Sequence, residues 1–262
     1  MQVWKDTNNR LSRRQIDANK AKGIIGSQVF FYEELTSTFD KIKELELKDG
    51  LTVVCAKQTS GSGRLGRSWE SSLGGVYFTF AIKDISDKFS VPFITLVCAL
   101  GVCKALGDYL PCQIKWPNDI VHNGRKLCGI LTKNLVSAGK VDTVLVGIGI
   151  NVNNSFSVNL PYAASVKSVT GKEEDENTLL FKVLDSIDEV YCCLTAEQVL
   201  KEYKENCVNL GREVTLVYEG KEVRGICRDI FPDGSMEVSS GMESFAVNSG
   251  EVSVKGIYTE GK

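Results

Sequence analysis

The sequence predicts an α+β protein: a mixed, largely antiparallel sheet with packed helices, followed by a small C-terminal β-barrel. Three observations support this fold class. An Asn-Gly pair separates two strand-like runs, which indicates a hairpin rather than a purely parallel sheet. One helical stretch is apolar on nearly every face, as expected of a helix buried against a sheet. Finally, five short strands crowd into roughly the last fifty residues, a density typical of a small barrel.

Strand and helix signals alternate through the first half of the chain. Ser37 is the expected N-cap of a helix that carries Ile42 and Leu45. Pro92 begins the helix that is apolar all round, and we expect this helix to lie across the sheet. Runs of β-branched and aromatic residues predict strands over residues 28–33, 51–57 and 76–82.

The second half contains the hairpin, two further helices and the barrel strands. Asn123-Gly124 is the expected hairpin turn. Apolar residues recur at helical spacing up to Leu194, and Thr195 with Gln198 forms a capping box for the next helix. The strands expected around the hairpin cover residues 113–116, 119–122, 126–131 and 141–150.

We divide the chain into three parts. Residues 1–26 are polar and form an N-terminal extension, expected to contain a helix and a loop. The main domain covers residues 27–208 and includes a polar connection over 152–176. A composition shift at Gly211 places the small barrel at residues 209–262.

Composition excludes several classes of function. The chain has 262 residues, with 31 basic against 33 acidic side chains, so it lacks the basic surplus of a nucleic-acid-binding protein. A single histidine, His122, almost excludes histidine-centred triads and histidine-rich metal sites. Nine cysteines without a CxxC pair indicate buried free thiols in a reducing compartment, so we expect a cytoplasmic protein. No apolar stretch is long enough to span a membrane.

A Gly/Arg loop runs from Gly61 to Trp69. Its glycines allow close backbone approach to a ligand, and its arginines match phosphate or carboxylate groups. Composition alone leaves open an anion-binding lid or a flexible surface loop. The loop fits the loose dinucleotide pattern G-x-G-x-x-G, but no amphipathic helix follows it, and no P-loop motif is present.

Three more segments carry groups suited to nucleotide chemistry. Lys115-Trp116-Pro117-Asn118-Asp119 presents an amide and a carboxylate at a strand end. Residues 125–131 place Lys126 just after the hairpin turn, with Gly129 close behind it. Residues 147–153 form an apolar strand with small residues that ends in amide side chains.

In this order and spacing, the four segments resemble those of biotin–protein ligases, ATP-dependent enzymes that attach biotin to a lysine of a carboxylase carrier domain. The resemblance runs from about Phe30 to Asn153. The family pattern G-[RK]-G-R-x-G-[RN] matches Gly61 to Arg67 except at Ser62, and K-W-P-N-D is intact at Lys115 to Asp119.

This resemblance implies a fold and a family type. It implies the biotin/lipoate ligase catalytic fold, similar to class II synthetases, over residues 27–208, with an SH3-like barrel after it. Residues 1–26 are too short for the DNA-binding domain that some members carry, so we expect the monofunctional type and no operator binding.

The resemblance also implies a two-step reaction. Biotin and ATP are the expected substrates, giving biotinoyl-5′-AMP, with Mg²⁺ held mainly by the phosphates and no protein metal site. Lys126, Arg64 and Arg67 match the cations that screen the reacting anions. Asp119 matches a carboxylate near the incoming lysine amine, where it could orient or deprotonate it.

Other positions match binding groups. The implied biotin contacts are Ser37, Thr38, Phe39, Gln58, Gly61, Ser62, Gly63, Arg64, Lys126 and Gly129. The implied ATP contacts are Arg64, Arg67, Trp69, Asn118, Lys126 and Asn151. From the residues alone, Ser37 could be only an N-cap, Trp69 only a core residue, and the two asparagines only turn residues. Four departures from the family pattern bear on affinity more than on reaction class: Ser62, Phe39, Cys128 and Lys133.

Two other functions stay open at this point. A lipoate or octanoate ligase shares the fold and the adenylation step, and a non-catalytic module could bind biotin or AMP without turnover. For the ligase, the expected partner is a biotin carboxyl carrier domain, with no nucleic acid and no membrane. Either a monomer or a homodimer is consistent with the sequence, and the barrel could serve acceptor docking, ATP binding or stability.

Overall fold

The computed structural model describes residues 10–83, 89–137, 139–218, 221–248, 252–254 and 257–258. Its main sheet has the strand order β1-β2-β4-β8-β7-β6-β5, and β3 pairs with β2. Among the described strands, β1 and β2 pair in parallel and the other neighbours are antiparallel, which confirms the predicted sheet. The strands are β1 (Gln28–Leu35), β2 (Leu51–Ser62), β3 (Ser68–Ser71), β4 (Gly75–Lys83), β5 (Gln113–Lys115), β6 (Asp119–His122), β7 (Arg125–Ser137) and β8 (Lys140–Asn151).

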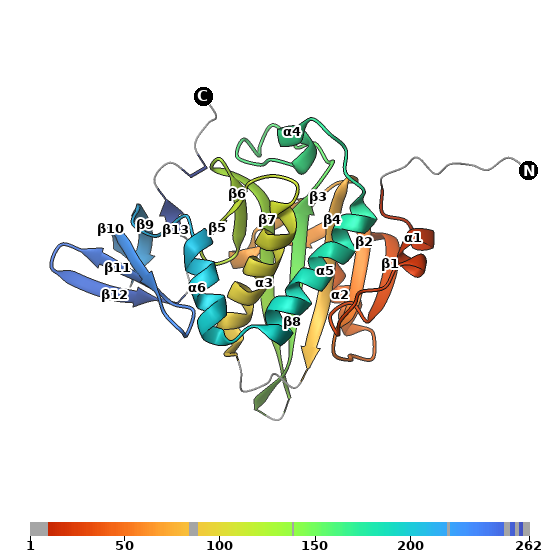
Figure 1. Ribbon diagram of the computed structural model, residues 1–262, viewed down its shortest axis with the longest axis horizontal. Coiled ribbons are helices and arrows are strands. Elements are labelled where there is room, and N and C mark those ends of the chain that lie inside the picture. The colour runs from red at the N-terminus through yellow and green to blue at the C-terminus, as the bar shows by residue number, and fades with distance from the viewer. Residues whose placement is uncertain are drawn as a thin grey trace, which may run out of the picture.

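Helices cover both faces of this sheet. Figure 1 shows α3 (Val91–Gly107) and α5 (Glu176–Cys193) side by side over one face. Twelve of the seventeen residues of α3 are buried, which confirms the prediction of a helix enclosed all round. On the other face, α2 (Thr38–Lys43) is capped by Ser37 and packs Phe39 and Ile42 into a second, smaller core. Because side chains alternate along a strand, Val53 joins this second core while Val54 joins the main one.

The expected hairpin joins β6 and β7. Asn123 and Gly124 have φ values of 46° and 76°, and positive φ at both central residues is what a type I′ turn requires. The pairing slips between Ile120 and Val121, so that Val121 lies opposite Lys126 rather than Leu127. This β-bulge places Lys126 on the same face of the sheet as Asp119.

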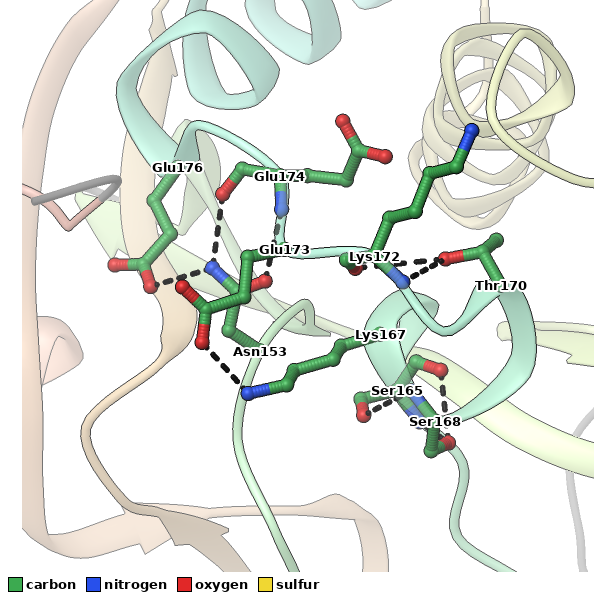
Figure 2. Close-up of polar contacts among 9 residues, drawn as sticks. All are labelled: Asn153, Ser165, Lys167, Ser168, Thr170, Lys172, Glu173, Glu174 and Glu176. Atoms are coloured by element: carbon green, nitrogen blue, oxygen red, sulfur yellow. Dashed lines mark hydrogen bonds and ion pairs between the residues drawn. The ribbon is translucent and has the colours of Figure 1, made fainter. Parts of the chain in front are cut away.

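The connection over 152–176 contains a helix that the sequence did not predict. The helix α4 (Val166–Thr170) has only five residues, too few to produce a periodic pattern, and a capping box of Ser165 and Ser168 begins it. Asn153 then fastens the end of the connection, because its side chain bonds the backbone of Glu174 and the carboxylate of Glu176 (Figure 2). These hydrogen bonds therefore hold the far end of the connection beside the residues that follow β8.

The predicted helix–loop character of the N-terminal extension and the capping box at Thr195 are both present. In the part of the extension that the structure describes, α1 spans Arg13–Ala18. Thr195 and Gln198 cap α6 (Ala196–Asn206). The helix α6 contacts α3 on one side and β10 of the second sheet on the other. No helix of the described residues is long and apolar enough to cross a membrane.

The five predicted C-terminal strands form an antiparallel sheet in the order β12-β11-β10-β9-β13. No pairing between β12 and β13 closes a barrel within the described residues, and the division into domains stays a prediction. Trp116 joins this sheet to the main one, because its indole N–H donates to the carbonyl of Gly234 at 3.0 Å. The strands are β9 (Glu213–Tyr218), β10 (Lys221–Ile230), β11 (Met236–Ser240), β12 (Glu243–Val247) and β13 (Val252–Val254).

We predict that Gly101→Ala destabilises the packing of α3 against α5. A Cβ at Gly101 would lie 2.7 Å from the Cα of Ile187, so the two helices would have to separate. The expected loss is about 1–3 kcal/mol of unfolding free energy, measured by urea denaturation. Gly107→Ala lies in the same helix, where the new Cβ would meet none of the described residues within 4 Å apart from its chain neighbours and its own helix backbone; it is the matched control and should be neutral or slightly stabilising. Equal effects of the two substitutions would contradict this account.

Candidate active site

The four segments singled out in the sequence converge on one cavity of about 640 Å³. The Gly/Arg loop forms one wall, and Lys115 to Asp119 form another. Small residues of β7 and β8 form the floor. The connection after β8 adds residues from Phe156 to Ala163, and the C-terminal part of the chain adds Tyr258.

Three glycines of the floor allow aromatic rings to lie directly on the sheet. A Cβ at Gly147 would meet the ring of Phe39 at 2.2 Å. A Cβ at Gly149 would meet the Trp69 indole nitrogen at 2.4 Å, and one at Gly129 would meet the same indole at 2.8 Å. The floor is therefore a flat apolar surface, suited to a ring or alkyl chain of a ligand.

A charged cluster lies at one end of this floor. The Lys126 ammonium lies 2.8 Å from Oδ1 of Asp119 and 5.1 Å from the centre of the Trp69 ring. The hydroxyl of Tyr258 donates to Oδ2 of the same carboxylate. Lys115 is buried nearby, with its ammonium 4.8 Å from the Tyr258 ring. Asp119 thus lies among two lysines and a tyrosine.

Opposing effects set the pKa of Asp119. Burial by itself raises the pKa of this carboxyl group, but the charges of Lys126 and Lys115 and the hydrogen bond from Tyr258 outweigh it. The net pKa of Asp119 is below its ordinary value, so the carboxylate is ionised at neutral pH. Burial and the neighbouring cations lower the pKa of Lys115, although the charge of Asp119 opposes this effect.

The Gly/Arg loop is held across the cavity. The Arg64 guanidinium donates to Oδ1 of Asn118 at 2.8 Å, and the Asn118 amide donates in turn to the carbonyl of Ile130. Within the loop, the N–H of Gly63 donates to the carbonyl of Arg67 at 2.7 Å. This closed turn keeps Arg64 and Arg67 among the residues that line the cavity.

Most of the predicted ligand contacts line the cavity. Thr38 and Gln58 are joined there, because the N–H and hydroxyl of Thr38 donate to Oε1 of Gln58. Two predicted contacts, Ser37 and Gly61, are not among the residues that line it. The Ser37 hydroxyl instead accepts from the N–H of Phe39, as its N-cap interpretation requires. The predicted contacts along the cavity are Thr38, Phe39, Gln58, Ser62, Gly63, Arg64, Arg67, Trp69, Asn118, Asp119, Lys126, Gly129 and Asn151.

Sequence reasoning gave no role to Tyr162, Tyr258 or the side chain of Lys115. Lys115 belongs to a recognised motif, so its position beside Asp119 could have been considered. Tyr258 belongs to no motif and lies 139 residues from Asp119 in the sequence. Only the tertiary structure brings it to the site.

Comparison with known proteins first gives the broad class of protein to which the chain is similar. The Biotin/lipoate A/B protein ligase family matches residues 31–151, the stretch that builds most of the cavity. A solved structure, the biotin protein ligase from Aquifex aeolicus in complex with biotin and ATP, superposes with a TM-score of 0.77 and 30% sequence identity. The match covers 87% of this chain and 98% of the Aquifex chain.

Curated relatives narrow this class of proteins further. The bifunctional ligase/repressor BirA of Bacillus subtilis is 32% identical over 192 residues, which cover 70% of this chain. The biotin–[acetyl-CoA-carboxylase] ligase of Mycobacterium tuberculosis is 24% identical, covering 78% of this chain and 79% of that protein. The chain belongs to the biotin protein ligase family. It spans 59% of the length of the Bacillus relatives that it matches.

We predict that Asp119 stabilises the fold in a pH-dependent manner. Its pKa is lowered from 3.8, so its contribution is present above about pH 4 and is lost as the pH falls through the folded-state pKa. Asp119→Asn should lower the unfolding free energy by about 1–3 kcal/mol at neutral pH. The difference from the wild type should shrink as urea denaturation is repeated toward about pH 3.5.

Asp40→Asn is the control for this experiment, because Asp40 lies exposed on α2. It should stay within about 0.5 kcal/mol of the wild type at each pH. A loss in Asp119→Asn that is the same at every pH would contradict the prediction.

Proposed function

We propose that this chain activates biotin with ATP to give biotinoyl-5′-AMP and transfers the biotin to a lysine of a biotin carboxyl carrier domain. The observation that carries the proposal is the position of Lys126, a cation held by Asp119 at the end of an apolar, glycine-lined floor. This arrangement suits a ligand with an apolar body and a terminal carboxylate. The Aquifex relative is described in complex with biotin and ATP, which supports the choice of these two substrates.

The first step joins two anions. A carboxylate oxygen of biotin attacks the α-phosphorus of ATP, the bond from that phosphorus to the bridging oxygen breaks, and pyrophosphate leaves with the electron pair. Lys126 would lie between the carboxylate and the α-phosphate, while Arg64 and Arg67 would cover the phosphates from the loop. These cations screen the repulsion between the reactants and the charge that grows in the transition state.

Magnesium would reach the site together with ATP. Within the described residues, no group of three or more His, Cys, Asp or Glu side chains could hold a metal ion, and the cavity is lined mainly by basic charges. A magnesium ion would therefore take most of its ligands from the phosphates and from water, and would neutralise part of the phosphate charge.

In the second step, the amine of the acceptor lysine attacks the acyl carbon of biotinoyl-AMP, and AMP leaves. Because its neighbours hold the pKa of Asp119 low, this carboxylate is a weak proton acceptor. We assign it the orientation of Lys126 and of the incoming lysine side chain, which attacks as the neutral amine after its ammonium group has lost a proton to water. The amine proton would then pass to water or to the departing phosphate.

Binding of the two substrates is divided along the cavity. Thr38 and Gln58 would offer hydrogen bonds to the polar head of biotin, and Gly129 would allow its tail to pass close to β7. Trp69, Asn118 and Asn151 are the proposed nucleotide contacts. The Trp69 indole N–H is buried and has no hydrogen-bond partner among the described residues, so it could donate to an acceptor on a ligand.

The decisive experiment supplies the protein with magnesium and ATP, together with biotin, octanoate or lipoate in parallel. We expect pyrophosphate release with biotin, followed by transfer to a biotin carrier domain. Lys126→Ala should slow pyrophosphate release on the order of a hundredfold, because it removes a cation from the reacting centre. Lys140→Ala, an exposed lysine at the start of β8, is the control and should behave as the wild type.

Each other outcome has a definite meaning. Release with octanoate or lipoate but not with biotin would assign the chain to the other branch of the Biotin/lipoate A/B protein ligase family. No release with any acid, despite biotin binding, would identify a non-catalytic module. Full activity of Lys126→Ala would refute the role given to that lysine. Sedimentation of the purified protein would decide between the predicted monomer and homodimer.

A further inference from the structure

Tyr258 reaches the candidate active site from beyond the last strand of the second sheet. Its N–H donates to the carbonyl of Gly124 at 2.7 Å, at the tip of the β6–β7 hairpin. Its hydroxyl donates to Asp119, at the other end of β6. One residue thus holds the hairpin at both ends of β6, the strand that carries Asp119, the ion-pair partner of Lys126.

We propose that Tyr258 is a positioning residue for the ligase reaction, holding the Asp119 carboxylate so that its other oxygen faces Lys126. This inference rests on the proposed function. A carboxylate can rotate about its Cβ–Cγ bond, and an ion pair to one oxygen leaves that rotation free. A hydrogen bond to the second oxygen fixes the plane of the group and therefore the position of the Lys126 ammonium.

The charges around Asp119 favour this arrangement. Lys126 faces it from β7, Lys115 from β5 and Arg64 from the loop, so the carboxylate stays ionised. Burial and the charge of Asp119 raise the pKa of the Tyr258 hydroxyl, which keeps it a donor at neutral pH. The other titratable groups near the carboxylate, Tyr203 and Cys128, have raised pKa values through burial and are uncharged.

A double-mutant cycle tests this role. The four proteins are the wild type, Tyr258→Phe, Asp119→Asn and the double variant. Tyr258→Phe should lower kcat for pyrophosphate release about tenfold, with the KM values for biotin and ATP changed less than about twofold. In the Asp119→Asn background the same substitution should have almost no further effect, because the neutral amide no longer forms the ion pair with Lys126 whose geometry the hydroxyl fixes.

Tyr109→Phe is the matched control, because Tyr109 is also half-buried beneath a lysine, Lys182 at 5.1 Å, but does not line the cavity. It should keep wild-type kinetics. The proposal would be overturned if the loss of kcat in the double variant equalled the product of the two single losses, or if Tyr258→Phe left kcat unchanged. If the wild type releases no pyrophosphate, the ligase function itself fails. In that case the unfolding midpoints of the same four proteins test the contact between Tyr258 and Asp119. Shifts in midpoint that add in the double variant would refute the contact.

Two cysteines outside the cavity form a close pair. The sulfur of Cys103, on α3, lies 3.5 Å from that of Cys112, which directly precedes β5. Cys103 is buried and Cys112 is half-buried, so one sulfur is shielded and the other is more accessible to a reagent. The hydrogen bond from Cys103 lowers the pKa of the Cys112 thiol, which increases its thiolate fraction.

We propose that Cys103 and Cys112 are a modification site that a low-molecular-weight disulfide oxidises to an intramolecular disulfide. The Cys112 thiolate attacks one sulfur of the reagent and expels one thiolate, which leaves a mixed disulfide. The Cys103 sulfur then attacks the Cys112 sulfur, loses its proton to water and expels the second thiolate. Two protein thiols are oxidised and one reagent disulfide is reduced. The bond would fasten α3 to the strand that leads into Lys115.

Treatment of the folded protein with oxidised glutathione, followed by peptide mapping by mass spectrometry, tests this site. We expect a peptide pair joined through Cys103 and Cys112, lighter by two hydrogen atoms and separable by dithiothreitol. Cys103→Ser should instead retain glutathione on Cys112, because no second sulfur displaces it. The exposed Cys192 and Cys193 report whether the reagent acted. Glutathione on those cysteines with unmodified Cys103 and Cys112 would overturn the proposal.

Discussion

The arrangement of the site depends on one buried carboxylate among several cations. Arg64, Arg67, Lys115 and Lys126 all line the same cavity, and screening of their repulsion is weakest at its buried end, where Lys115 and Asp119 lie. Asp119 is paired with Lys126 and lies close to Lys115, so it offsets part of this positive charge. The cavity keeps a positive excess, and an anionic ligand would relieve it. This positive excess therefore suits the cavity to anionic ligands.

Backbone geometry brings these charges together. The type I′ turn at Asn123-Gly124 sets the hairpin, and the bulge beside it turns Lys126 to the face that carries Asp119. Without that slip in register, alternation along β7 would direct Lys126 to the opposite face. The glycines of β7 and β8 then let Phe39 and Trp69 lie flat on the strands, so the apolar floor ends at the ion pair.

The second sheet takes part in the site as well as in the fold. Trp116 fastens the segment that carries Asn118 and Asp119 to a turn of that sheet. Asn209 lies in the link between the two sheets, and its side-chain oxygen accepts a hydrogen bond from the backbone N–H of Trp116. Tyr258 adds a side chain directly to the carboxylate. Of the three roles open for this sheet at the outset, acceptor docking, ATP binding and stability, these contacts favour stability, because they hold segments of the candidate active site in place.

Local patterns in the sequence determined the main sheet, its hairpin, the enclosed helix and the five C-terminal strands, because turn chemistry and hydrophobic periodicity act over a few residues. They also identified most of the cavity lining, through the motifs around Arg64, Asp119 and Lys126 together with residues 147–153. The five-residue helix α4 was too short to leave a periodic signal. Only the tertiary structure decided that Ser37 does not line the cavity, that a bulge turns Lys126 toward Asp119, and that Tyr258 completes the cluster. These three outcomes depend on pairing register and on contacts between distant segments, and a one-dimensional pattern carries neither.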